Sequence, residues 1–224
     1  PWLVALDPDS GKPIWKTAGN LPSYGSLLAG RFGNVDQIVG HDVGSLGGWD
    51  VATGKRLWRL IPEHPKDFNV ATPIQFGNQL LVMTENNGTR LFDFSDDGII
   101  VPRPVAVYAE LASDTHTPVV VHDRLCGVFE GLHCLDLKHR LRPLWTSRDR
   151  AFEAHASLIT DDRRVLVTTL HGELLLIDVQ ADAPTIIGRA RVFPTEAGLY
   201  SHPALVGSRL YLRGSDSVVA LELN

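Results

Sequence analysis

Three histidines, His116, His155 and His202, are the residues whose type and spacing could most readily support chemistry. Each lies where a short apolar segment begins, so the three occupy corresponding places in successive stretches of the chain. Imidazoles that converge from separate strands can bind zinc, contact an organic ligand or partner, or line a wet channel. No His-x-His or His-Glu-x-x-His spacing favours the metal. A structural role for the three histidines, lining a channel of the fold, is therefore favoured, with ligand contact as the alternative.

No Ser/His/Asp arrangement rises above chance in this sequence, and it contains no phosphate-binding loop. Candidate residues must therefore be judged by where the fold places them, and the fold follows from an internal repeat of about 43 residues. In the copy at Ser45–Leu60, Asp50 ends one strand, Gly54 lies in a tight turn and Trp58 belongs to the next strand. An aspartate oxygen can accept N–H groups of such a turn, and glycine supplies its positive φ.

The repeat recurs along the whole chain. The residues that end the corresponding strands are Asp7, Asp50, Phe94, Asp136, Asp178 and Glu222. Turn glycines follow four places later at Gly11, Gly54 and Gly98, and tryptophans occupy the next strand at Trp15, Trp58 and Trp145. A repeat of this length is typical of a propeller blade.

Each repeat contains four short strands bounded by turn residues, and no segment has a convincing helical pattern. The first full unit has strands at 25–29, 36–40, 46–50 and 56–60, and the second at 72–76, 79–84, 89–94 and 99–107. The sequence therefore predicts an all-β fold, a β-propeller of four-stranded antiparallel blades with about 43 residues each, four complete and two partial. Both ends of the chain supply a third strand, so residues 1–224 are interpreted as one domain within a longer six- to eight-bladed ring. A closed five-bladed ring is the alternative.

Antiparallel geometry brings the start of each first strand and the turn between the second and third strands to the same channel mouth. Ligands commonly bind at such a concave site, where polar groups converge. The candidate ligand-binding residues there are Tyr24, Thr72, Glu85, Asn87, His116, His155, His171, His202 and Arg213. Glu85-Asn86-Asn87-Gly88 is also typical of a plain hairpin turn, and Arg213 of a solvated rim.

The two cysteines, Cys126 and Cys134, flank a predicted turn at Glu130-Gly131. A two-residue loop would place the thiols on opposite faces of the sheet, whereas a three-residue loop would allow a disulfide bond. The first arrangement is favoured, with both cysteines as small buried hydrophobic residues.

Composition argues against two classes of partner. The chain carries 21 Lys and Arg against 26 Asp and Glu, with a net charge of −5 and no basic cluster for a nucleic-acid surface. No apolar run approaches the roughly 18 residues of a membrane-spanning segment, so no membrane insertion is expected. The chain opens at Pro1 within a strand, which suggests a piece of a longer protein.

The xLxALDxxTGKxxW pattern resembles the PQQ-like repeat family, propellers related to pyrroloquinoline quinone dehydrogenases. The matching residues are Val4-Ala5-Leu6-Asp7 with Gly11-Lys12 and Trp15, then Trp49-Asp50, Thr53-Gly54-Lys55 and Trp58, and in part Cys134-Leu135-Asp136 with Trp145. The resemblance implies that Trp15, Trp58 and Trp145 dock one blade against the next. It also implies a bacterial cell-envelope protein, in a periplasmic or extracellular location.

Quinone-dependent members of the family use an adjacent cysteine pair, a calcium ion and a tryptophan beneath the cofactor. Here the cysteines are separated and no acidic cluster has a calcium-loop spacing, so a bound PQQ or calcium ion is not the favoured expectation. We expect a non-catalytic scaffold that binds a protein or a small-molecule ligand. One alternative is a quinone- or metal-dependent oxidoreductase at the channel mouth, and another is a platform that binds peptides along open strand edges.

Overall fold

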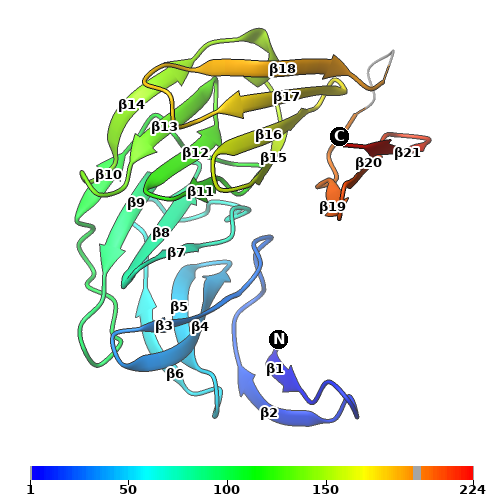
Figure 1. Ribbon diagram of the computed structural model, residues 1–224. Helices are drawn as coiled ribbons and strands as arrows, with labels where there is room; N and C mark the ends of the chain where they lie inside the picture. The colour runs from blue at the N-terminus through cyan, green and yellow to red at the C-terminus, as the bar shows by residue number, and fades with distance from the viewer. Residues whose placement is uncertain (1, 194–197, 224) are drawn as a thin grey trace. The chain divides into compact units, whose positions relative to one another are not determined.

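The computed structural model describes residues 2–193 and 198–223, which form a series of antiparallel β-sheets (Figure 1). Over these residues four sheets have four strands, one has two and one has three. Two compact units divide the chain, residues 1–114 and residues 115–224. The predicted all-β fold of four-stranded antiparallel sheets is confirmed. A single domain in a six- to eight-bladed ring stays a prediction.

Unit 1 contains three of these sheets. The first pairs β1 (Trp2–Leu6) with β2 (Pro13–Ala18). The second has the order β3 (Leu28–Phe32), β4 (Val35–Asp42), β5 (Ser45–Asp50) and β6 (Arg56–Leu60). The third has the order β7 (Ile74–Phe76), β8 (Gln79–Thr84), β9 (Gly88–Asp93) and β10 (Ala106–Tyr108).

Unit 2 repeats the pattern. Its first sheet has β11 (Val119–Val121), β12 (Arg124–Val128), β13 (Leu132–Asp136) and β14 (Arg142–Ser147). A 3-10 turn, η1 (Arg150–Phe152), precedes the sheet of β15 (Ala156–Thr160), β16 (Arg164–Thr169), β17 (Glu173–Asp178) and β18 (Thr185–Arg191). The last sheet has β19 (Ala204–Val206), β20 (Arg209–Arg213) and β21 (Val218–Glu222).

Several strands differ from their predicted bounds. The first strand of a blade starts later than predicted, at Leu28 in place of Gly25 and at Ile74 in place of Thr72. The strand predicted at 99–107 is reduced to an isolated bridge at Ile100 and the three-residue β10. Pro102 and Pro104 interrupt it, because proline has no N–H to donate to a β-ladder.

The turn that closes the repeat has the predicted geometry. Asp50 Oδ1 accepts hydrogen bonds from the Thr53 N–H at 2.8 Å and the Thr53 hydroxyl at 2.6 Å, and Gly54 has φ 69°. A β-bulge also falls at the same place in four repeats, opposite the two residues before the closing aspartate. The extra residue is aliphatic each time: Ile14, Leu57, Leu144 and Ile187.

The residue that closes the third copy is Asp93, not Phe94 as predicted. Asp93 pairs with Gln79 across the ladder, as Asp50 pairs with Gln37. Gly98 therefore lies five residues after the closing aspartate. The four-residue spacing between aspartate and glycine placed the end of this strand one residue too late, because the turn in this copy contains one extra residue.

Side chains fasten each sheet to its neighbour within a unit. Trp58 is buried, donates through Nε1 to Gln37 Oε1 at 2.7 Å and meets Phe94 of the next sheet edge-on. Gln37 Nε2 in turn donates to the Gly98 carbonyl at 2.8 Å. Trp15 lies against Gly54 and donates to the Val51 carbonyl at 2.8 Å. These contacts join consecutive sheets in unit 1 through buried aromatic and amide groups.

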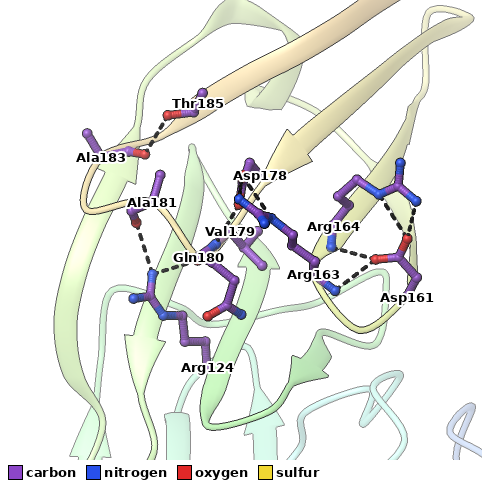
Figure 2. A network of polar contacts seen from close by, with 10 residues as sticks. All are labelled: Arg124, Asp161, Arg163, Arg164, Asp178, Val179, Gln180, Ala181, Ala183 and Thr185. Carbon is purple, nitrogen blue, oxygen red and sulfur yellow. Dashed lines mark hydrogen bonds and ion pairs between the residues drawn. The ribbon is translucent and has the colours of Figure 1, made fainter.

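In unit 2 an arginine makes the hydrogen bond that corresponds to the one from Trp15 to the Val51 carbonyl. Arg124 of β12 donates to the carbonyl oxygens of Val179 and Ala181, at 2.6 and 2.9 Å (Figure 2). Val179 follows Asp178 as Val51 follows Asp50. In the same view, Arg163 pairs with Asp178 and Arg164 with Asp161. Trp145 lies in a buried cluster that spans this pair of sheets. These observations support the blade-docking role that the resemblance implies for the tryptophans.

Candidate functional site

His116 is buried in unit 2 and serves the fold. Its Nε2 accepts a hydrogen bond from the Val128 N–H at 3.0 Å. Burial, together with the neighbouring His155 and His202, lowers the pKa of His116 to about 3. His116 is therefore neutral at ordinary pH, with its Nε2 lone pair already committed to the backbone.

The other two histidines are more open. The ring of His155 lies 5.6 Å from that of Tyr200, and His202 is exposed, with Nδ1 3.1 Å from the Pro203 carbonyl oxygen. Each of them acts electrostatically on His116 and so lies near it, while a shared ligand-binding role for the three histidines stays a prediction. Among the described residues, no group of three or more His, Cys, Asp or Glu side chains has the arrangement of a metal site.

The remaining predicted residues do not form one described site. Tyr24 is exposed and touches Phe68 edge-on, while the Thr72 hydroxyl accepts the Ser26 N–H at 3.1 Å. His171 and Arg213 are exposed in unit 2, where their carbonyl oxygens accept hydrogen bonds from Arg191 and Ser201. A ligand-binding role for these four residues stays a prediction.

Glu85 and Asn87 hold a neighbouring loop in place. Glu85 Oε1 accepts the Phe68 N–H at 2.9 Å. Asn87 accepts the His64 N–H at 3.0 Å and donates to the His64 carbonyl at 2.8 Å and to Asp67 at 2.8 Å. Asn86 also donates to Asp67, through both its backbone and its side chain. The turn from β8 to β9 thus fixes the loop that leads from β6 to β7.

A pocket of about 490 Å³ lies beside this anchored loop. Its walls come from the end of β6, the β8–β9 turn, strand β9 and the segment that leads into β10. The lining residues include Pro62, Glu63, His64, Glu85, Asn87, Arg90, Phe92, Pro102, Pro104 and Val107. The volume falls within the range of ordinary ligand sites. We take this pocket as the candidate functional site.

Arg90 is a buried charged residue in the lining of the candidate site. Its side chain is 8% exposed, and Nη2 donates to the Thr84 hydroxyl at 3.0 Å. The Thr84 hydroxyl also lowers the pKa of Asp67 by donating to its carboxylate. Burial lowers the pKa of Arg90 to about 10, while the negative charge of Asp67 opposes that shift. Arg90 and Asp67 are therefore linked through one hydroxyl group.

His41 of β4 lies close to Arg90. A cavity of about 10 Å³ between them, lined also by Leu46, Leu60 and Val82, has room for one water molecule at most. Burial and the positive charge of Arg90 lower the pKa of His41 to about 4. The imidazole is therefore neutral next to the buried guanidinium group.

Sequence reasoning missed Arg90, Asp67 and His41. The one available signal was an arginine within the predicted strand 89–94, between Thr89 and Leu91. Charged residues are almost never buried unless they are paired, so that position alone indicated a special environment. The environment itself comes from His41 and Asp67, which are far away in the sequence.

Comparison with known families gives a match over unit 1. Residues 2–101 match the PQQ-type family model described as outer membrane protein assembly factor BamB. The PQQ-like resemblance is confirmed. A comparison with curated proteins finds no match.

Solved structures with a similar fold include BamB from Moraxella catarrhalis, at 17% identity and a TM-score of 0.63. The C-terminal WD40 domain of Sif2 is also similar, at 12% identity and a TM-score of 0.68. A chain of a mitotic checkpoint complex is similar at 15% identity and a TM-score of 0.71. The matches cover 97%, 98% and 97% of this chain but only 65%, 62% and 67% of the other chains, in that order. At such identities the similarity shows the β-propeller fold alone.

The PQQ-like repeats raise the question of the quinone itself, and the described residues do not fit it. Cys126 and Cys134 are fully buried in a core cluster, away from any pocket described above. Trp49 is a tryptophan that could lie beneath a quinone, but the Arg56 guanidinium group covers one face of its ring, 4.8 Å from the ring centre. No reaction step through a quinone is assigned to these residues.

Among the described residues, no helix is long and apolar enough to cross a membrane.

Proposed function

We propose that this chain is a non-catalytic scaffold of the bacterial cell envelope, and that it binds a partner protein at the candidate site of unit 1. The PQQ-like match over residues 2–101 supports the scaffold class, since its family description names an outer membrane protein assembly factor. The envelope location follows from that description and from the BamB structure, as a family-level inference.

The observation that carries the proposal is the use of the polar side chains around the pocket. Glu85, Asn86 and Asn87 form hydrogen bonds with the loop from β6 to β7. These bonds hold the loop in place, and the loop and the three residues together form one wall of the pocket. A wall held in this way is preorganised, which lowers the entropic cost of binding. Such an arrangement suits a receptor for a partner.

The neighbouring strand edge suits an extended partner segment. Strand β10 is the outermost strand of its sheet, and Val107 at its centre is 57% exposed and lines the pocket. An exposed strand edge offers unpaired backbone groups to another chain. A segment that adds to β10 would run beside Val107, which lines the candidate site.

Site-specific photo-crosslinking in the full-length protein tests this proposal. A photoreactive residue in place of Val107 should give a discrete cross-linked product in the native envelope fraction. The matched control is Ile187, which is 51% exposed on the outer strand β18 of unit 2. Products from position 107 that are absent at 187 would support the site. No product at 107, or identical products at both positions, would overturn it.

The proximity of His116, His155 and His202 favours one second candidate, a metal- or quinone-dependent oxidoreductase. The purified full-length protein can be incubated with calcium, zinc or PQQ and analysed for bound metal and quinone absorbance. Stoichiometric binding that is lost in a His155→Ala, His202→Ala double variant would support the enzyme. Binding that the variant retains, or no binding, would count against it.

A further inference from the structure

Arg90 retains hydrogen-bonding capacity that the protein does not use. A guanidinium group has five N–H donors, and Arg90 commits one of them, through Nη2, to Thr84. Its Nε has no hydrogen-bond partner. Among the described residues, Arg90 forms no direct ion pair, and Asp67 acts on it only through the electrostatic effect on its pKa. A cation that is nine-tenths buried usually has a carboxylate in direct contact.

The protein compensates the charge of Arg90 only in part. Among the described residues, Asp67 is the carboxylate whose charge raises the pKa of Arg90, and the Thr84 hydroxyl bonds to both side chains. Glu63 and Glu85 also line the pocket, but neither raises the pKa of Arg90. Because burial outweighs the effect of Asp67, the guanidinium group would gain from a further negative partner.

The candidate site has room for such a partner. Its volume of about 490 Å³ exceeds what one side chain fills, and Arg90 belongs to its lining. Pro62, Pro102, Pro104 and Phe92 add apolar groups to the lining of the same pocket, and the Arg90 guanidinium carbon lies 5.8 Å from the centre of the Phe92 ring. A charge-assisted hydrogen bond is strengthened in such surroundings, because little water competes for the donors.

We propose that Arg90 receives the carboxylate of an acidic side chain, carried by an extended segment of the partner protein that lies along β10. This inference rests on the proposed function, since it names the group by which the partner is anchored. The free donors of Nη1 and Nη2 can hold a carboxylate end-on with two parallel hydrogen bonds.

A carboxylate fits this site better than a phosphate group. Glu63 and Glu85 line the same pocket, and their negative charges would repel a dianion more strongly than a monoanion. The same rim charges would favour a partner segment with a basic residue close to its acidic anchor. The edge position of β10 favours an acidic side chain within a continuous segment over a chain terminus.

Stability can separate this role from a purely structural one. Arg90→Met keeps an unbranched, flexible side chain, shorter than that of arginine, and places an apolar group beside Leu46, Leu60 and Val82. Burying a charge that no carboxylate contacts directly is unfavourable, and an apolar residue at the same position does not carry that cost. We therefore expect the melting temperature of Arg90→Met to equal or exceed that of the wild type. A large drop would show that Arg90 serves the fold.

Binding is tested with three labelled peptides of equal length and the full-length protein, by fluorescence polarisation at low salt. One peptide carries a central Glu, the second a central Gln, and the third has only a free C-terminal carboxylate. Wild-type protein should bind the Glu peptide at least tenfold more tightly than the other two. Arg90→Met should remove this preference and Arg90→Lys should reduce it. The matched control Arg31→Gln changes an exposed arginine of the same unit and should leave it intact.

Each outcome bears on one of the two proposals. Equal affinity for the Glu and Gln peptides, or a Glu preference that survives in Arg90→Met, would overturn the carboxylate anchor. Tighter binding of the terminal carboxylate would overturn the assignment to an internal side chain. If the Val107 cross-link persists while the Glu preference is absent, the docking site stands and the anchor fails. If both are absent, the proposed function fails as well.

Discussion

The sulfur atoms of Cys126 and Cys134 lie 3.7 Å apart, and both side chains are fully buried. The two residues are direct partners in β12 and β13. A backbone hydrogen bond from Leu137 to Asp123 marks one end of this ladder, and alternation along it makes the cysteines a non-hydrogen-bonded pair. Side chains approach most closely in such pairs. The prediction that the thiols point to opposite faces was wrong, because the hairpin has a three-residue loop.

This geometry predicts that the two thiols can form a disulfide bond. Refolding in a glutathione redox buffer should oxidise the pair, with two electrons and the two thiol protons passing to oxidised glutathione, which becomes two molecules of reduced glutathione. The loop closed is short, so the expected gain in the free energy of unfolding is about 2 kcal/mol. Intact mass and thiol titration of the unfolded product measure the outcome. Cys134→Ala is the control, and two reactive thiols after refolding would contradict the prediction.

Trp58 should contribute more to stability than Trp15. Trp58→Phe removes the Nε1–H donor to Gln37 Oε1, which is itself completely buried, so we expect a loss of about 1–3 kcal/mol. Trp15 donates to an exposed turn and is only half-buried, so Trp15→Phe should cost less. Urea unfolding of the two variants gives the comparison. Equal losses would show that the buried amide is not the cause.

Gly54 is required for two separate reasons, which a matched glycine can separate. Its φ is 69°, and a Cβ atom there would lie 2.4 Å from the Trp15 ring. Gly77 has φ 58° with open space around it. Gly77→Ala should therefore cost about 1 kcal/mol from backbone strain alone. Gly54→Ala should cost about 1–3 kcal/mol more from overpacking, as measured by urea unfolding. Similar losses in both variants would assign the whole effect to φ.

Acidification should destabilise the protein well before its carboxylates titrate. Burial lowers the pKa of His41 to about 4 and that of His116 to about 3. Both histidines stay neutral in the folded state, whereas the unfolded chain binds protons below about pH 6.5. The unfolded state then holds more protons, so stability falls as the pH drops from about 6.5 toward these values.

The expected loss by pH 5 is about 2 kcal/mol for each of the two histidines. Urea midpoints at pH 7 and pH 5 give the slope. A His41→Gln, His116→Gln double variant should show a flatter dependence, because glutamine does not titrate and its side-chain oxygen can still accept the Val128 N–H. An unchanged slope in the double variant would show that other groups cause the loss.

The sequence alone determined the repeated architecture. Closing aspartates, turn glycines and strand tryptophans act through contacts between residues close in the chain, such as Asp50 with Thr53. Local contacts of this kind recur with the sequence period, so the four-stranded units could be predicted. The third copy misled the prediction by one residue, because an insertion in its turn changes the spacing without changing the pattern.

Only the tertiary structure decided how the candidate site is built. Arg90, Asp67 and His41 lie on different elements, and their proximity depends on how two sheets pack and on where the loop after β6 folds back. The length of the hairpin loop likewise decided which face each cysteine occupies. Burial and electrostatic partnership are properties of the folded surroundings of a side chain. They do not follow from its type or its place in a repeat, which is why the tryptophans were foreseen and the buried arginine was not.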